Sequence, residues 1–268
     1  MTMKKGKFFI LIALTCTLVN CGQPKKIAAK PNEANGSLNS LYEIPPADKV
    51  KAAKLNIELG VNYLKQEQIS RAKSKFIRAK DLAPNLPEVH YTYGYFLERV
   101  GENDEAEKAY LKAISLNSKE GNAHNMYGAF LCRQKNFKQA EKEFLKAVDD
   151  PNFTQTAEAY ENAGLCVLQI PEVAKATEYL EKSLRYDLNR PSALLELAII
   201  KFQSRQFDEA KDFHAKFAQI SKANARSLLL GVEIAKHFND KNLEQRSKLL
   251  LNAQYPNATV ADLYKKKS

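Results

Sequence analysis

The sequence is poor in the residues that metal sites and nucleotide-binding sites need. It has four cysteines, four histidines and no tryptophan among 268 residues, and no glycine-rich segment of the kind that cradles a phosphate. His214 and His237 have no histidine or cysteine partner at the spacing of zinc ligands. His90 and His124 lie 34 residues apart, as equivalent positions of a repeat would. These absences argue against a metal site and against any cofactor.

Glycine and proline are also scarce, at ten each, and clusters of β-branched residues are missing. Alanine, leucine, glutamate, lysine and glutamine run through the chain instead, and these residues favour helices. The formal net charge is +10, but basic and acidic side chains alternate rather than gathering in one patch. The composition therefore predicts an all-α protein and gives no support for a nucleic-acid partner.

One short pattern is shared with enzymes. Ser70 and Lys73 match the Ser-x-x-Lys pattern of some hydrolases. Ala72, between them, belongs to the repeat described below, and Ser70 fits the start of a helix. No other nucleophile and base form a recognised catalytic pattern, so we expect no enzymatic activity.

The amino terminus has the features of a bacterial lipoprotein signal. Lysines precede a 12-residue apolar stretch, Phe8 to Val19, which is shorter than the roughly 20 residues that span a bilayer. The following Leu18 to Cys21 resembles a lipobox, whose cysteine is acylated before cleavage. We therefore expect residues 1–20 to be a signal peptide and Cys21 to carry lipid. The alternatives are an unmodified secreted protein and an uncleaved signal anchor.

The segment after Cys21 predicts where the protein resides and how far it reaches. Gly22, rather than aspartate, follows the cysteine, and the resemblance to lipoproteins then implies the outer membrane, with the protein facing the periplasm. Residues 21–48 contain four prolines and few large apolar residues, which is typical of a flexible tether with a reach of about 25–30 Å. The folded domain is expected over 49–256, followed by a tail over 257–268.

The strongest pattern is a repeat of about 34 residues. The small residues at one position are Gly60, Gly94, Gly128, Gly164, Ala198 and Gly231. An alanine follows 12 residues after each of the first four, and a large side chain follows four residues after that alanine. Two antiparallel helices can cross closely where both present small residues. The period predicts a right-handed superhelical solenoid of about six tetratricopeptide units, namely 53–86, 87–120, 121–156, 157–190, 191–223 and 224–256.

Two cysteines lie within the repeats. Cys132 and Cys166 fall in the first helices of the third and fourth units, which a solenoid places side by side. If Cys16 leaves with the signal peptide and Cys21 is acylated, these are the remaining thiols in an oxidising compartment. The sequence is compatible with two alternatives, a disulfide between these cysteines and a pair of buried free thiols.

The concave face of such solenoids is lined by set positions of the first helices, and these positions suggest a binding groove. In the first two units they include apolar residues that the helix crossing does not need, namely Ile57, Val61, Leu64, Tyr91 and Tyr95. We interpret them as a groove for an extended or helical peptide. The alternative is that the tether or a terminal segment covers them. In the third and fourth units the same positions are more polar.

Some segments go beyond the general repeat. Asn125 to Cys132 and Glu161 to Cys166 resemble the PilF/PilW family of type IV pilus biogenesis and stability lipoproteins, as do Pro191 to Ala198 and Leu249 to Pro256. The resemblance spans nearly the whole mature chain, and the two cysteines match that family's pair.

That resemblance implies a pilotin, an outer-membrane lipoprotein that binds the pilus secretin and promotes its localisation and multimerisation. We expect a monomer. The alternative function is a tetratricopeptide lipoprotein adaptor that gathers envelope enzymes, or a subunit of another outer-membrane assembly complex.

Overall fold

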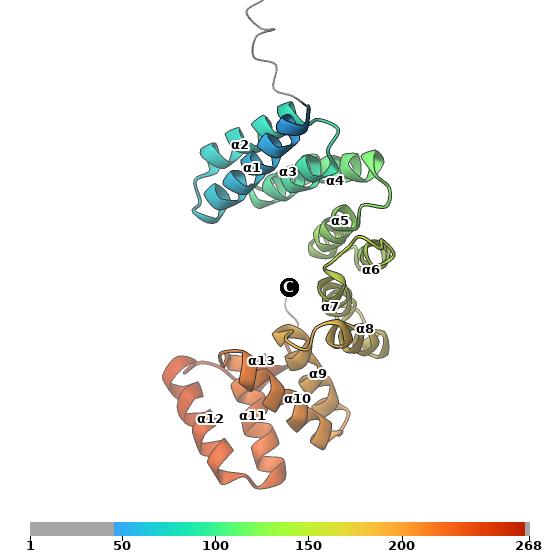
Figure 1. Ribbon diagram of the computed structural model, residues 1–268. Coiled ribbons are helices and arrows are strands. Elements are labelled where there is room, and N and C mark those ends of the chain that lie inside the picture. The colour runs from blue at the N-terminus through green and yellow to red at the C-terminus, as the bar shows by residue number, and fades with distance from the viewer. Residues whose placement is uncertain (1–45, 266–268) are drawn as a thin grey trace, which may run out of the picture. The chain divides into compact units, whose positions relative to one another are not determined.

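The computed structural model describes residues 46–265 (Figure 1). The expected signal peptide, the lipidated Cys21 and the tether lie outside the described residues. Within 46–265 the chain forms thirteen helices and no strand, which confirms the all-α class. No helix in this range is both long enough and apolar enough to cross a membrane.

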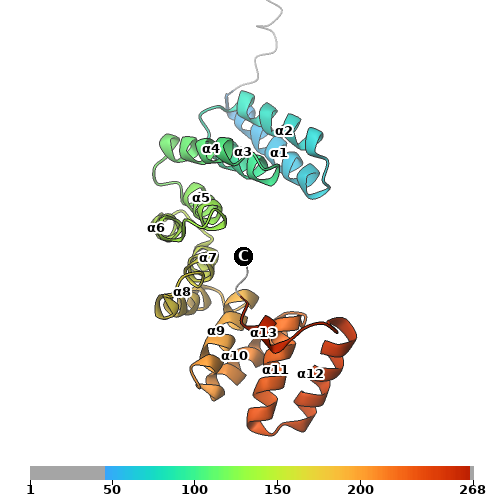
Figure 2. The same ribbon diagram turned by 180° about the vertical axis from the view of Figure 1, so that it is seen from behind.

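Twelve of the helices form six successive helical hairpins, one for each predicted unit (Figures 1 and 2). The hairpins are α1 (Pro46–Lys65) with α2 (Ile69–Leu82), α3 (Pro87–Arg99) with α4 (Asn103–Leu116), α5 (Gly121–Arg133) with α6 (Phe137–Val148), α7 (Thr156–Val167) with α8 (Val173–Tyr186), α9 (Pro191–Gln203) with α10 (Phe207–Ile220), and α11 (Ala225–Phe238) with α12 (Lys241–Gln254). First helices of successive hairpins contact one another, so the stack is a solenoid. Helix α1 begins at Pro46, ahead of the expected domain start at 49.

Steric contact explains the period. A Cβ atom added at Gly60 would lie 3.0 Å from the ring of Phe76, and one at Gly128 would lie 2.9 Å from the ring of Phe144. Real Cβ atoms rarely approach that closely, so these positions accept only glycine without a shift of the ring. The crossing alanines of the second helices are fully buried, as at Ala72. The repeat therefore encodes a close helix crossing with a large side chain wedged beside it.

In five of the six hairpins the turn between the helices has the same backbone conformation. The residue that reverses the chain has a left-handed φ, as in Glu67, Gly101, Lys135, Arg205 and Asn239. A left-handed residue just past a helix end is a common way to terminate it. Four of the five are not glycine, so this turn is set by geometry more than by residue type.

The segment after Pro256, expected as a tail, contains a further short helix, α13 (Val260–Leu263). It packs against α11 because Leu263 is fully buried in the core of the last units. Arg226 on α11 donates from Nε to the Leu263 carbonyl at 3.1 Å and also pairs with Glu196 on α9. The segment around α13 is thus bonded to α11, and α11 is paired in turn with α9.

Candidate functional site

The predicted groove of the first two units is shallower than the sequence suggests. Ile57 and Leu64 are 5% and 6% exposed and belong to the core, where they pack with residues of α2 and α3. Their burial corrects the expectation that they are open, because α3 covers this side of α1. Val61, Tyr91 and Tyr95 are only partly buried and form the accessible part, which we call the α1/α3 surface.

The chemistry of the α1/α3 surface suits a polypeptide. Burial, together with the charges of Glu88 and Glu120, raises the pKa of Tyr91, so its hydroxyl stays protonated and can donate a hydrogen bond. Lys54 on α1 pairs with Glu88 on α3 at 3.4 Å and supplies a charged rim. Partly buried tyrosines with a polar end are frequent at interfaces.

A cavity of about 460 Å³ lies between α5, α6 and α7, and the repeat pattern did not predict it. Its apolar wall includes Ala129, Phe137, Leu165 and the two cysteines, Cys132 and Cys166. Its polar residues are Arg133, Lys135, Asn162 and Gln169. A smaller cavity of about 150 Å³ shares Leu165 and Gln169 with it and extends to α9. Two features hide this cavity from the repeat pattern. The groove positions on the first helices of the third and fourth units include polar residues, and part of the apolar wall comes from α6, which is a second helix.

Cys132 and Cys166 are joined in a disulfide, with their Cα atoms 5.8 Å apart. That distance lies in the usual range for a disulfide. The bond links α5 to α7 across the boundary of the third and fourth units, so of the two alternatives left open by the sequence the structure has the disulfide. Within residues 46–265 no free thiol remains.

Ion pairs and hydrogen bonds also join neighbouring first helices. Glu98 on α3 pairs with Arg133 at the end of α5 and accepts a hydrogen bond from the Tyr110 hydroxyl at 3.2 Å. Glu161 on α7 pairs with Arg190 and accepts a bond from the backbone N–H of Ala193 at 3.0 Å. A surface fixed in this way loses little conformational entropy when it binds a partner.

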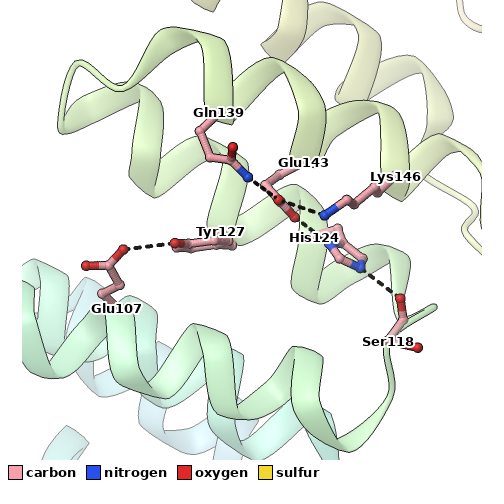
Figure 3. Close-up of polar contacts among 7 residues, drawn as sticks. All are labelled: Glu107, Ser118, His124, Tyr127, Gln139, Glu143 and Lys146. Carbon is pink, nitrogen blue, oxygen red and sulfur yellow. Dashed lines mark hydrogen bonds and ion pairs between the residues drawn. The ribbon is translucent and has the colours of Figure 1, made fainter.

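A buried polar network holds the third unit together (Figure 3). His124 on α5 donates from Nδ1 to Glu143 on α6 at 2.7 Å and from Nε2 to the Ser118 carbonyl at 3.0 Å. Glu143 also accepts bonds from Gln139 at 2.7 Å and from Lys146 at 3.0 Å. The side chains of His124 and Glu143 are each 3% exposed. Because no substrate could reach them, the network is structural.

The remaining candidates for chemistry are dispersed. Ser70 and Lys73 are exposed in the first turns of α2, and no hydrogen bond joins them. His90 and His214 each bond a backbone carbonyl, and His237 stacks on Phe207 with ring centroids 3.7 Å apart. In the part of the chain that the structure describes, no three His, Cys, Asp or Glu side chains gather as metal ligands would.

Comparison with known proteins gives a consistent result. A tetratricopeptide-repeat profile matches residues 87–120. The type IV pilus assembly protein PilF of Pseudomonas aeruginosa is 34% identical over 222 residues, which cover 83% of this chain and 87% of that protein.

Two solved structures extend the likeness to three dimensions. A structure of Pseudomonas aeruginosa PilF aligns with a TM-score of 0.74 at 33% identity, over 78% of this chain and 95% of that one. The structure of PilW, described as a widely conserved type IV pilus biogenesis factor, shares the fold, with a TM-score of 0.67 at 24% identity over 80% of this chain and 98% of that one.

Proposed function

The chain belongs to the PilF family of tetratricopeptide-repeat proteins of type IV pilus biogenesis, and on this premise we propose that it is the pilotin of the pilus secretin. In this role it is an outer-membrane lipoprotein that faces the periplasm, binds the secretin and promotes its multimerisation. It catalyses no reaction. The observation that carries the proposal is the 34% identity with PilF, which extends over 83% of this chain and 87% of that protein.

The physical basis of this role has two parts. Acyl chains on Cys21 would hold the protein at the membrane, since two or more chains anchor stably where one does not. The tether would then let the solenoid search a volume with a radius of about 25–30 Å. Confinement of this kind raises the effective concentration of the binding surface near a secretin subunit. The lipid thus supplies the location and the repeats supply recognition.

We propose that the α1/α3 surface contacts the secretin. Val61, Tyr91 and Tyr95 offer an apolar and aromatic patch beside the Lys54–Glu88 ion pair. An extended or helical segment could place apolar side chains on this patch while its polar groups meet the rim.

The test of the pilotin role is the state of the secretin in outer-membrane fractions of cells that lack this gene. Heat-resistant secretin multimers should disappear on deletion and return with the wild-type gene. The Cys21→Ala variant should fail to restore them at the outer membrane. Multimers that persist after deletion would contradict the proposal and favour the general envelope adaptor.

The surface assignment is tested separately, with one substitution on α1 and one on α3. Val61→Glu and Tyr95→Glu should abolish the multimers while helical content stays that of the wild type. Leu55→Glu is the matched control, because Leu55 lies on α1 but is 55% exposed. If multimers form normally in Val61→Glu and Tyr95→Glu, the secretin binds elsewhere on the protein.

A further inference from the structure

The sixth unit differs from the third and fourth units at two positions of the repeat. One is four residues before the small residue of the first helix, and the other is just before the large side chain of the second helix. In the third unit His124 and Glu143 meet there at 2.7 Å, and in the fourth unit Tyr160 and Tyr179 stack. In the sixth unit the two positions hold Ser227 and Arg246.

The large side chain itself is also missing in the sixth unit. In the first four units the small residue faces Phe76, Tyr110, Phe144 or Leu180. In the sixth unit a Cβ at Gly231 would lie 2.9 Å from the Ser247 hydroxyl. The same Cβ would lie 3.3 Å from the imidazole of His214 on α10, so the close helix crossing is retained, but the second helix of this unit contributes no large side chain to it.

A cavity of about 290 Å³ lies beside Ser247, between α10, α11 and α12. Figure 2 shows these helices side by side at the end of the stack, as their contacts require. The walls are formed mainly by His214, Phe217, Leu228, Leu243, Ser247 and Leu250. An unfilled apolar space forfeits dispersion contacts with its walls, so a side chain from another molecule would gain those contacts on entering.

The charge at this cavity has one sign. Arg246 is exposed and is the only formally charged residue in its wall, and within residues 46–265 it makes no hydrogen bond or ion pair. His214 donates to the Ser227 carbonyl at 2.8 Å, and burial lowers its pKa, so it is neutral near pH 7. An arginine without a partner presents a fork of donors suited to a carboxylate.

We propose that this cavity docks a segment of a partner protein in which an aromatic side chain lies next to an acidic residue. The ring enters the cavity beside Ser247, which stands at the position that Phe144 has in the third unit, and the neighbouring carboxylate pairs with Arg246. A buried aromatic anchor beside an arginine is the usual composition of an interface hot spot. The site lies on α10 to α12, so it is additional to the α1/α3 surface proposed for the secretin and does not depend on that assignment.

The experiment measures binding of fluorescein-labelled peptides to the full chain in lipid nanodiscs. The first peptide is Gly-Ser-Phe-Glu-Ser-Gly, and the two others replace its Phe by Ala or its Glu by Gln. The Phe-Glu peptide should bind at least tenfold more tightly than either. A version with benzoylphenylalanine in place of Phe should photo-crosslink to Leu243 or Leu250.

Two variants test the two parts of the site. Ser247→Phe fills the cavity with the residue found in the third unit, so it should weaken the Phe-Glu peptide at least tenfold while the melting temperature does not fall. Arg246→Gln should weaken that peptide about tenfold and leave the Phe-Gln peptide unchanged. Arg205→Gln, an exposed arginine in the turn before α10, is the matched control and should change neither.

Three results would overturn the proposal. One is the absence of binding by all peptides up to millimolar concentration. Another is undiminished binding in a folded Ser247→Phe variant, or in Ser247→Leu, which copies the fourth unit, should the phenylalanine variant not fold. The last is displacement of the peptide by laurate at lower concentration than by unlabelled peptide, which would make the cavity a lipid site.

Discussion

The second and third units place a histidine at the same position and use it differently. His90 and His124 each lie four residues before the glycine of the helix crossing. Each donates from Nε2 to a carbonyl in the turn before its helix, at 2.6 Å and 3.0 Å respectively. The difference is on the second helix, where the second unit has Ala109 and the third has Glu143.

That single difference reverses the electrostatics. Burial lowers the pKa of His90, and its carbonyl bond only partly offsets this. Burial also disfavours the charged form of His124, but bonds to Glu143 and to the Ser118 carbonyl outweigh it and raise its pKa. Burial would raise the pKa of Glu143, yet bonds from His124 and Lys146 lower it. One backbone frame therefore accommodates a neutral histidine in one unit and a buried ion pair in the next.

The same two units also differ in how they are joined to their neighbours. Glu98 in the second unit and Cys132 in the third occupy equivalent positions, 34 residues apart. Glu98 pairs with Arg133 of the following unit, whereas Cys132 is bonded to Cys166 of the following unit. The repeat therefore fixes where neighbouring units touch, while the side chains at those positions decide how strongly the units are held together.

The largest expected effect comes from removing the covalent link. The double substitution Cys132→Ala and Cys166→Ala should lower the free energy of unfolding by about 3–4 kcal/mol, because the open chain gains the entropy of a loop of roughly 34 residues. Urea unfolding followed by circular dichroism measures the loss. Reduction of the wild type should reproduce it. A double variant as stable as the oxidised wild type would show that the disulfide does not hold the two units together.

Breaking the ion pair of the third unit should have the next largest effect. Glu143→Ala removes the carboxylate that accepts bonds from His124, Gln139 and Lys146, so it leaves buried donors without their acceptor and should cost about 3 kcal/mol in the same unfolding experiment. The control is Glu105→Ala, because Glu105 is exposed and its bond to Lys108 contributes little. Equal losses in the two variants would mean that the buried pair adds no stability beyond a surface one.

The pKa of His90 should lie below 6.5 and the pKa of His124 above it, as measured by NMR of the imidazole protons. His124 then stabilises the fold fully below pH 6.5, and this contribution is lost as the pH rises through its raised folded pKa. The contribution of His90 has the opposite sign, since it is present above pH 6.5 and lost as the pH falls towards its lowered folded pKa. In Glu143→Gln the pKa of His124 should move below 6.5, to the side of His90. A His124 pKa that stays above 6.5 there would assign the shift to another group.

Features that follow from the period of the repeat, such as the helix crossings, could be predicted from the sequence. Features that depend on how one helix is rotated against another, such as side-chain burial and ion pairs, could not. The small residues at Gly60 and Gly128 predicted the close crossings, and the position of Cys132 placed it beside the next unit. The burial of Ile57 depends on how deeply α3 covers α1, which the period does not encode. The His124–Glu143 pair joins residues 19 apart on different helices, and only their packed orientation brings them together.

The smallest expected effect is at the boundary between the second and third units. Arg133→Gln should cost about 1 kcal/mol or less, because the arginine side chain is 51% exposed and Glu98 keeps its bond from Tyr110. Solvent-exposed charges are screened by salt, so the difference from the wild type should shrink in 1 M NaCl. The effect of removing the disulfide should not change with salt in this way. Urea unfolding at low and high salt therefore separates the two kinds of link, and an Arg133→Gln effect that is large and independent of salt would mean that the ion pair behaves as a buried one.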